Sequence, residues 1–325
     1  TGAIPMKNFT NKVAVITGAG SGMGRYLAIL LAQAGANIAA CEINKTTLAE
    51  TVAMLADYPV KVSSHILDVA DKAAIEALPA KVIAEHGCVD LVFNNAGVTV
   101  DSTFEDLSES DWDWVFNINL QAVINSSRAF LPHLKQRPEA ALINTSSIFG
   151  MIALERQSVY HTAKFAVRGF TECLAKEMKD STVQIHCVHP GHIGTNIVTN
   201  ARMNKSEESA SSMERLVGKV MGLGDSQEEL AKFFRENGMH ASRASEVILN
   251  GVRKKRSRIM VGTDAKLMDL AQRLTPMHYE TLFPLFTLPL TLLRNKKPLK
   301  GMPAEIATPT SASPKADTNK TQETA

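Results

Sequence analysis

The chain has 325 residues, 45% of them hydrophobic, which is enough to bury a large core and excludes disorder over its whole length. Its formal net charge is only +2, with basic and acidic residues mixed, so we expect a small neutral ligand and no nucleic-acid partner. The four cysteines lie far apart and form no CxxC pair, which is typical of reduced thiols in a cytoplasmic protein rather than of a disulfide frame or a zinc site.

The first 190 residues alternate short β-rich apolar runs with longer helical patterns. This alternation predicts βαβ units in an α/β fold, with a parallel sheet that is buried on both faces. The long helices also suit subunit interfaces. The predicted helices are residues 26–33, closed by Gly35, then 111–134 and 158–179, and the predicted strands are 12–17, 37–42, 61–68, 91–94, 141–146 and 183–189, with 258–261 as a seventh.

A glycine-rich loop follows the first predicted strand directly and leads into the first helix. Glycines allow a tight turn and a close backbone approach to a ligand, and the helix start offers N–H groups and a positive dipole end to a pyrophosphate. A strand before the loop and a helix after it is the context that dinucleotide binding requires. The loop reads Thr17-Gly18-Ala19-Gly20-Ser21-Gly22-Met23-Gly24 and lacks the Gly-Lys-Ser/Thr ending of a triphosphate-binding loop.

The second predicted strand ends at Glu42. A carboxylate there can bind both hydroxyls of an adenosine ribose and would repel a 2′-phosphate, which favours NAD over NADP. Ser21 and Ile43 supply no positive charge for a phosphate, whereas Arg25 and Lys45 are close enough in sequence to leave NADP possible. The alternative for Glu42 is an ordinary solvated residue at the end of a strand.

Tyr160 and Lys164 lie four residues apart in a predicted helix, so both side chains share one face. A phenol with a pKa of about 10 is a poor base at neutral pH, and a nearby ammonium lowers that pKa toward the useful range. The pair alone is common, and taken alone it is better explained as a solvated helix face.

The chain contains further motifs in a fixed order: after the glycine loop come Asn94-Asn95-Ala96-Gly97, Asn119, Ser147, Tyr160-x-x-x-Lys164 and Pro190-Gly191. Together these motifs resemble the short-chain dehydrogenase/reductase family over about residues 8–262. The resemblance implies a single Rossmann-type domain, doubly wound, that holds both cofactor and substrate.

The resemblance also implies a role for each matching residue. Tyr160 would be the general acid or base, Lys164 would bind the nicotinamide ribose, and Ser147 would bind the substrate oxygen. Asn119 would hold a water molecule that links Lys164 to solvent. Asp68 and Val69 would lie beside the adenine, and Ile193 and Thr195 on the carboxamide side, with a strand-end cap as the alternative role for Asp68. The implied cofactor contacts are Gly18, Gly20, Ser21, Gly22, Met23, Gly24, Glu42, Asp68, Val69, Asn95, Ala96, Gly97, Tyr160, Lys164, Pro190, Gly191, Ile193 and Thr195.

Three histidines recur at every third position but do not predict a metal site. His186 and His189 differ by an odd number on a strand and should face opposite sides, and His192 falls in the following loop. We expect His192 to line the substrate mouth. His161, next to Tyr160, is either structural or a substrate contact.

The C-terminal third departs from the βαβ pattern. Residues 196–239 are polar, rich in Ser and Glu, and predict either a substrate lid with an adaptable apolar wall or short helices that bury the same side chains. Residues 263–299 form a partly apolar extension, and 300–325 are too poor in large apolar residues to order themselves. The large apolar residues of the insertion are Met203, Met213, Leu216, Met221, Phe233 and Phe234.

The segment 282–297 leaves the membrane question open. The N-terminus shows no secretory signal, and no stretch is apolar enough to span a bilayer. The segment starts at Leu282, is interrupted by Pro284 and Pro289, and ends in basic residues up to Lys297. It either packs against the body or a neighbouring subunit, or anchors a cytoplasmic protein at the membrane surface.

Three functions fit these features. The first is a dehydrogenase or reductase of secondary alcohols and ketones, bulky and apolar if the insertion is a lid. The second is an NADPH-dependent 3-oxoacyl-thioester reductase, against which Glu42 counts. The third is a catalytically silent dinucleotide-binding scaffold or sensor, whose signature would be loss of Tyr160, Lys164 or Ser147, and all three are present. The resemblance suggests a homodimer or homotetramer.

Overall fold

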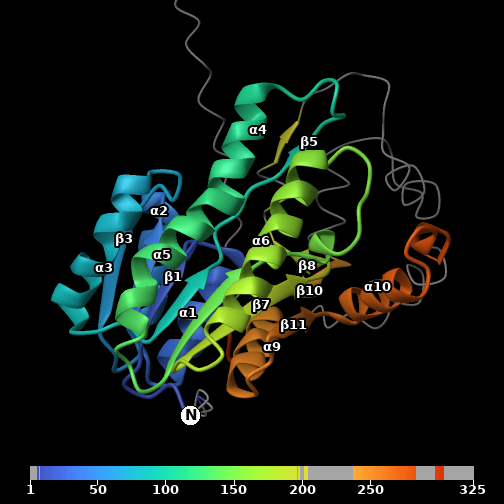
Figure 1. Cartoon of the computed structure of the whole chain (residues 1–325). Coiled ribbons are helices and arrows are strands. Elements are labelled where there is room, and N and C mark those ends of the chain that lie inside the picture. Colours follow the sequence, from blue (N-terminus) through green and yellow to red (C-terminus); the bar gives the residue numbers. More distant parts are fainter. Residues whose placement is uncertain are drawn as a thin grey trace, which may run out of the picture.

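The computed structural model describes residues 6, 8–195, 197, 201–203, 237–282 and 297–303. Within them, seven parallel strands form one sheet in the order β11-β7-β6-β4-β1-β2-β3 (Figure 1). The predicted doubly wound α/β fold is therefore confirmed, with strand ends that move by no more than two residues. The strands are β1 (Val13–Thr17), β2 (Asn37–Glu42), β3 (Val62–Ile66), β4 (Leu91–Asn94), β6 (Ala140–Thr145), β7 (Val183–Pro190) and β11 (Arg258–Val261).

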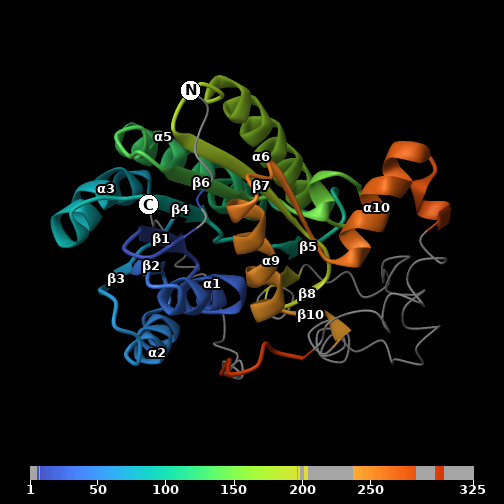
Figure 2. The ribbon, with the colours of Figure 1, turned by 90° about the horizontal axis from the view of Figure 1, so that it is seen from below.

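Helices cover both faces of the sheet, as the view from below shows (Figure 2). Successive side chains of a strand point to opposite faces, and β1 illustrates the result. Ala14 and Ile16 belong to the core cluster under one helical layer, and Val13 and Val15 to the cluster under the other. The first layer is α1 (Gly22–Gln33), α2 (Lys45–Leu55) and α9 (Ala241–Arg253), and the second is α3 (Lys72–His86), α5 (Ala122–Leu134) and α6 (Ser158–Glu177).

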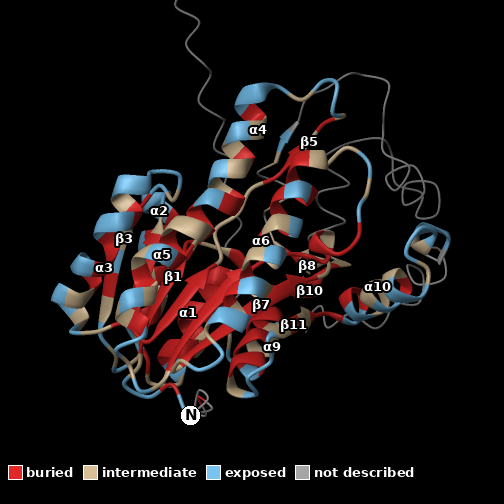
Figure 3. Ribbon diagram, viewed as in Figure 1, coloured by how far each residue is buried: buried red, intermediate tan, exposed pale blue. Residues whose placement is uncertain are grey.

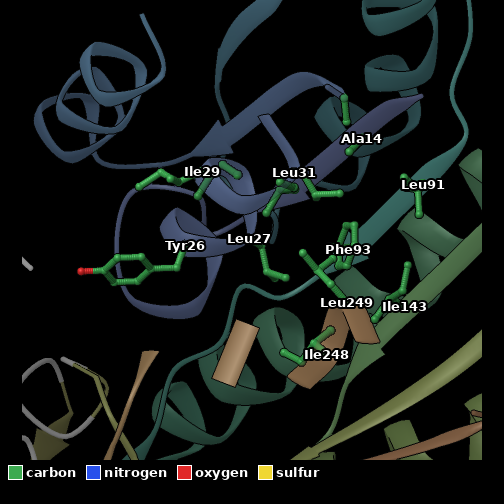
Figure 4. Close-up of a cluster of buried hydrophobic side chains, with 14 of the residues drawn as sticks. Ala14, Tyr26, Leu27, Ile29, Leu31, Leu91, Phe93, Ile143, Ile248 and Leu249 are labelled. Carbon is green, nitrogen blue, oxygen red and sulfur yellow. The ribbon is translucent and has the colours of Figure 1, made fainter. Parts of the chain in front are cut away.

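The core is continuous across the strands because their apolar side chains are buried on both sides (Figure 3). Under the first layer, Leu27 and Leu31 of α1 meet Phe93 of β4 and Ile248 and Leu249 of α9 (Figure 4). This packing fixes the carboxyl ends of the strands relative to one another. The loops that follow those ends therefore start from a rigid edge.

The predicted helix 111–134 is longer and less regular than its pattern suggests. It begins as α4 (Glu109–Phe116), where the Ser108 hydroxyl oxygen accepts a hydrogen bond from the Asp111 N–H at 3.1 Å. A π-helical turn, η1 (Asn117–Gln121), then leads into α5. Such turns are frequent at functional sites. This one carries Asn119.

Both ends of the predicted insertion 196–239 are tied to the body by short strand pairs. Before the insertion, β8 (Ile193–Gly194) pairs with β10 (Met239–His240) at its far end, and β9 (Arg202–Met203) pairs with β5 (Val100–Asp101). The rest of the insertion, with Met213, Leu216, Met221, Phe233 and Phe234, lies outside the described residues. Its role as a lid stays a prediction.

The C-terminal extension begins with α10 (Thr263–Leu274) and the 3₁₀ turn η3 (Tyr279–Leu282), and α10 points away from the sheet (Figure 1). Residues 297–303 return to the body, where the Tyr26 hydroxyl donates to the Pro303 carbonyl at 2.7 Å and Arg243 Nε to the Lys297 carbonyl at 3.2 Å. The first residues of the predicted tail thus contact α1. Residues 304–325 and 283–296 lie outside the described part. Among the helices that are described, none has the length and apolarity to cross a membrane.

Candidate active site

Thr17, the last residue of β1, joins two of the predicted cofactor loops. Its hydroxyl donates to the Phe93 carbonyl at 3.2 Å and accepts the N–H groups of Asn95 at 3.0 Å and Ala96 at 3.1 Å. The Asn95 amide nitrogen also donates to the Thr17 carbonyl at 3.1 Å. The glycine loop and the Asn95-Ala96-Gly97 segment are therefore held side by side at the carboxyl edge of the sheet.

The glycine loop has no room for side chains at its turn. Gly18 has a φ of 66°, a left-handed conformation that costs a residue with a Cβ free energy. A Cβ on Gly24 would collide with the Gly18 carbonyl, and it would lie 2.8 Å from the Asn95 amide nitrogen. Ser21 precedes α1 without capping it through its side chain. The Ser21 side chain therefore leaves the N–H groups at the start of α1 to a ligand with acceptor oxygens.

Glu42 lies against this loop rather than in bulk solvent. One carboxylate oxygen accepts the Gly20 N–H at 3.1 Å, and the other accepts the N–H groups of Ile43 at 2.9 Å and Asn44 at 3.1 Å. Two carboxylate oxygens offer about four acceptor positions, so capacity remains for a ribose hydroxyl. The solvated alternative for Glu42 does not describe this geometry.

Arg25, which left NADP open in the sequence, turns its charge inward. It is buried, its Nη2 contacts Glu50 at 2.7 Å and the Gly20 carbonyl, and its Nε donates to the Thr51 hydroxyl at 3.0 Å. The guanidinium is occupied by these contacts, and it stabilises the glycine loop from the side of α2. Lys45 is exposed at the start of α2.

Asn119 and Lys164, one member of the catalytic pair, both lie close to Gly97. The Asn119 amide binds the peptide of Val98 through both polar atoms, accepting the N–H at 2.9 Å and donating to the carbonyl at 2.8 Å. A Cβ on Gly97 would lie 3.2 Å from Asn119 Oδ1 and 3.6 Å from Lys164 Nζ. The π-helical turn therefore brings Asn119 next to Lys164, whereas the water molecule that the family resemblance assigns to Asn119 stays a prediction.

Lys164 is 3% exposed and donates a hydrogen bond to the Thr145 carbonyl at 3.0 Å. Its Nζ lies 5.6 Å from the centroid of the Tyr160 ring, so the two side chains share a face of α6 as expected. Burial lowers the pKa of Lys164 to about 8. The amine can therefore lose or regain its proton near physiological pH.

Tyr160 is buried and forms a hydrogen bond with Ser147. Burial raises the pKa of Tyr160 to about 12, and the bond to Ser147 counteracts only part of that rise. We expected Lys164 to lower this pKa, but desolvation of the phenolate is the larger effect here. At neutral pH the phenol is thus protonated and ready to act as an acid.

Ser147 lies two residues after the end of β6 and caps the short turn 148–150, its hydroxyl oxygen accepting the Phe149 N–H at 3.1 Å. Its carbonyl accepts a hydrogen bond from Nδ1 of the buried His189 at 3.0 Å, and burial lowers the pKa of His189 to about 4. His189 therefore stays neutral at physiological pH. It supports Ser147 from the neighbouring strand.

His161 proves to be a structural residue. Its Nδ1 donates to the Phe149 carbonyl at 2.9 Å and its Nε2 accepts the Leu154 N–H at 3.1 Å, so both ring nitrogens are used by the backbone. His186 donates through Nδ1 to the Arg256 carbonyl at 2.7 Å. Within the described residues, no cluster of His, Cys, Asp or Glu side chains has the arrangement of a metal site.

Of the residues predicted beside the adenine, Val69 lines a small cavity with Thr17 and Ala96. The Asp68 side chain is exposed and accepts the Ala70 N–H at 2.9 Å, which is the capping role named as the alternative. The Asp68 carboxylate is thus directed to its own turn, and the contact of Val69 with the adenine stays a prediction.

The loop after β7 closes the site on the side of Pro190 and Gly191, and it contains a contact that sequence reasoning missed. The His192 N–H donates to Asp264 in the first turn of α10 at 2.7 Å. The sequence offered one signal, an acidic residue two positions after Gly262, where a helix follows the last strand. Its partner, 72 residues away, could not be named from that signal.

The residues at this edge fit a dinucleotide. The glycine loop leaves a space that a Cβ would fill, Glu42 has acceptor capacity, and Asn95 Oδ1 is buried without a hydrogen-bond partner among the described residues. Tyr160, Lys164 and Ser147 lie together next to this cradle. Fold and site therefore define a Rossmann-type oxidoreductase that uses a nicotinamide dinucleotide.

Comparison with known proteins agrees with this class. A model of the short chain dehydrogenase family matches residues 12–206. SadH of Mycobacterium tuberculosis, which carries the name of an oxidoreductase, is 37% identical over 281 residues, covering 85% of this chain and 95% of SadH. The structure resembles a short-chain dehydrogenase/reductase of Burkholderia phymatum in complex with NAD, with a TM-score of 0.71, 26% identity, and coverage of 91% of this chain and 99% of that one.

Two further relatives differ in what they act on. A 3-oxoacyl-acyl-carrier-protein reductase, FabG of Thermotoga maritima, is 35% identical over 201 residues, 62% of this chain and 81% of FabG. A cyclohexanol dehydrogenase of Acinetobacter is 36% identical over 197 residues, 60% of this chain and 78% of that protein. The chain thus belongs to the short-chain dehydrogenase/reductase family and is an NAD(P)-dependent oxidoreductase.

The cradle can be tested by adding one methyl group at Gly24. The change Gly24→Ala should abolish measurable NADH binding, because the new Cβ would overlap the Gly18 carbonyl and push the loop out of shape. NADH fluorescence titration measures the effect. The matched control is Gly169→Ala in α6, where a Cβ would meet nothing within 4 Å and binding should stay unchanged. Equal NADH affinity in the Gly24→Ala variant would contradict the assignment of this loop.

Proposed function

We propose that the protein transfers a hydride between its nicotinamide cofactor, preferably NAD, and a secondary alcohol or ketone. The observation that carries this proposal is the buried group of Ser147, Tyr160 and Lys164 beside the glycine cradle. A silent scaffold would not need three buried polar side chains held at this edge. Similarity to the cyclohexanol dehydrogenase, which is named for a secondary alcohol, supports the substrate class.

The cofactor would be held by the glycine loop, Glu42, Asn95 and Thr195, and when bound it supplies the hydride acceptor or donor. The chain itself handles the oxygen and its proton. Ser147 and Tyr160 bind the substrate oxygen through their hydroxyl groups, so the reacting carbon is oriented before reaction.

Proton transfer takes place at the Tyr160 hydroxyl. In reduction, the phenol donates its proton to the substrate oxygen as the alcohol forms. In oxidation, the phenol must first lose that proton, which its burial opposes. Lys164, held by the Thr145 carbonyl, supplies a positive charge near the phenol while it remains protonated. Asn119 fixes the Val98 peptide next to them.

Phe149 is the apolar side chain that supports a bulky apolar substrate. It lies edge to face with Tyr160, with ring centroids 6.2 Å apart. Ile148, Met151 and Ile152 of the same segment are buried in a core cluster with Ala265 of α10, so they anchor the segment. The ion pair of Arg156 with Asp101, at 3.2 Å, ties the segment to the strand that follows Gly97.

A thioester reductase is the second candidate, supported by the 35% identity to FabG of Thermotoga maritima. Glu42 and the inward-facing Arg25 count against the NADPH preference that we expect of that function. The two candidates differ in substrate. A panel of secondary alcohols with NAD, and of 3-oxoacyl thioesters with NADPH, separates them by the ratio of kcat/KM values.

Tyr160→Phe should abolish alcohol oxidation and ketone reduction, with a loss of at least about a hundredfold in kcat, because the ring remains but the proton-transfer group is gone. NADH binding, followed by fluorescence, should change little. Turnover at the wild-type rate would disprove the role of Tyr160.

The pH dependence of the wild-type enzyme provides a second test of the same residue. Since the pKa of Tyr160 lies at about 12, oxidation should rise by about tenfold from pH 6 to pH 7, below the Lys164 pKa of about 8, whereas reduction should stay nearly flat.

Glu42 should set the cofactor preference. We expect NADH to bind at least about tenfold more tightly than NADPH, because the carboxylate repels a 2′-phosphate. Glu42→Gln removes the charge and keeps one of the two acceptor oxygens, so it should bring the NADH and NADPH dissociation constants closer together. Glu76→Gln, on exposed α3 surface, is the control. Tighter NADPH binding by the wild-type protein would reverse the proposed preference.

We further propose that the protein is a homodimer or homotetramer built through the long helices α4, α5 and α6.

We also propose that this cytoplasmic protein makes a peripheral membrane contact through Leu282–Lys297. Exposed apolar side chains support the membrane contact, since Leu270 and Leu274 lie on one face of α10, with Met277 just beyond it. These residues directly precede the segment in sequence. Its own placement, apart from Leu282 and Lys297, falls outside the described residues.

Vesicle sedimentation tests this contact. The full chain should cosediment with vesicles that contain anionic lipid, and Leu270→Ser together with Leu274→Ser should reduce the bound fraction, because both changes remove exposed apolar area. NADH binding serves as the control for folding in the same samples. A bound fraction that is the same for both proteins, or absent in both, would remove the membrane proposal.

A further inference from the structure

A buried carboxylate at the start of the C-terminal extension lies against the loop that follows β7. Asp264 is 3% exposed, although Asp is seldom buried this deeply in proteins. It occupies the first turn of α10, where the positive end of a helix favours a negative charge. Its Oδ2 accepts the backbone N–H of His192 at 2.7 Å.

The peptide groups around His192 are held from several directions. The His192 carbonyl accepts the Met239 N–H at 2.9 Å, and the Gly191 N–H donates to the Val261 carbonyl at 2.8 Å. A Cβ on Gly191 would lie 2.6 Å from Asp264 Oδ1. The carboxylate thus fills the volume that a side chain at position 191 would need, and it is the charged member of this set of contacts.

This loop reaches the cofactor cradle within three residues. The Thr195 N–H donates to the Ile193 carbonyl at 2.9 Å, which folds the loop back on itself. The Thr195 methyl group lies 3.2 Å from the position of a Cβ on Gly22 in the glycine loop. The direction in which the chain leaves His192 therefore decides where Ile193 and Thr195 stand relative to the cradle.

We propose that Asp264 is a positioning residue for the nicotinamide end of the cofactor. It fixes the His192 peptide, and through it the placement of Ile193 and Thr195. The proposal rests on the role of these two residues on the carboxamide side of the cofactor. A hydrogen bond to a carboxylate is stronger than one to a neutral acceptor, so a charged residue gives the loop a more definite position. The extension beyond residue 262 is then part of the cofactor site.

The test compares two ligands that share the adenosine diphosphate ribose part. Asp264→Ala should weaken NADH binding by about tenfold, since a charge-assisted hydrogen bond is lost. ADP-ribose, which lacks the nicotinamide ring and its carboxamide, should bind within about twofold of its wild-type affinity. Isothermal titration calorimetry on the full chain gives both dissociation constants.

Two variants keep the experiment decisive. Asp264→Asn keeps an acceptor oxygen without the charge, so it should fold even if the alanine variant does not, and NADH binding should weaken by only about threefold with ADP-ribose unchanged. Asp269→Ala, in the same helix and paired with Arg273 at 3.0 Å, is the matched control and should leave both affinities unchanged.

The outcomes are distinct. Equal losses for NADH and ADP-ribose would show a general structural role and overturn the proposal, and so would unchanged NADH affinity in a folded Asp264 variant. Failure of the wild-type protein to bind NADH more tightly than ADP-ribose would instead contradict the carboxamide contacts of Ile193 and Thr195, on which the proposal rests.

Discussion

One hydroxyl group, that of Thr17, holds together the two loops from which the cofactor cradle is made. It uses its single donor on the Phe93 carbonyl and both acceptor positions on the N–H groups of Asn95 and Ala96. The ends of β1 and β4 are parallel neighbours, and the pairing of the two strands stops at Ile16 and Phe93, just before the loops begin. A side chain at the junction satisfies these groups, and the rigid core beneath transmits its position to the rest of the edge.

Burial governs the chemistry of the catalytic pair in opposite directions. It raises the pKa of Tyr160 and lowers that of Lys164, because in both cases the charged form loses hydration. The hydrogen bonds to Ser147 and to the Thr145 carbonyl satisfy the polar atoms without restoring what water would provide. The site therefore allows proton transfer at the Tyr160 hydroxyl, whereas burial disfavours a permanent phenolate.

The sequence was most informative where a pattern repeats over many residues. Seven strands were predicted because each of the seven runs is long enough to be recognised as apolar and β-rich. Two-residue strands such as β8 and β10 are too short to show such a pattern. The π-helical turn at Asn119 was not predicted, because the five residues Asn117–Gln121 are too few to show a periodicity of their own.

The residues that form the site could be predicted from the sequence, whereas the pKa of its catalytic tyrosine could not. Motif order named Ser147, Tyr160 and Lys164, and the structure brings them together. The pKa of Tyr160 depends on burial, which four-residue spacing does not report. Asp264 depends on a contact between neighbouring strand ends, and the inward turn of Arg25 depends on Glu50 and Thr51, both far from it in sequence.

The buried Arg25 has a consequence for anyone who redesigns the cofactor preference. Releasing its guanidinium toward a 2′-phosphate would leave Glu50 without its partner and the Gly20 carbonyl without its donor, and the glycine loop would lose this support. A new cation is better introduced at Ile43, which is 60% exposed and follows Glu42 directly. The existing arginine is best left in place, as part of the scaffold that an altered enzyme would inherit.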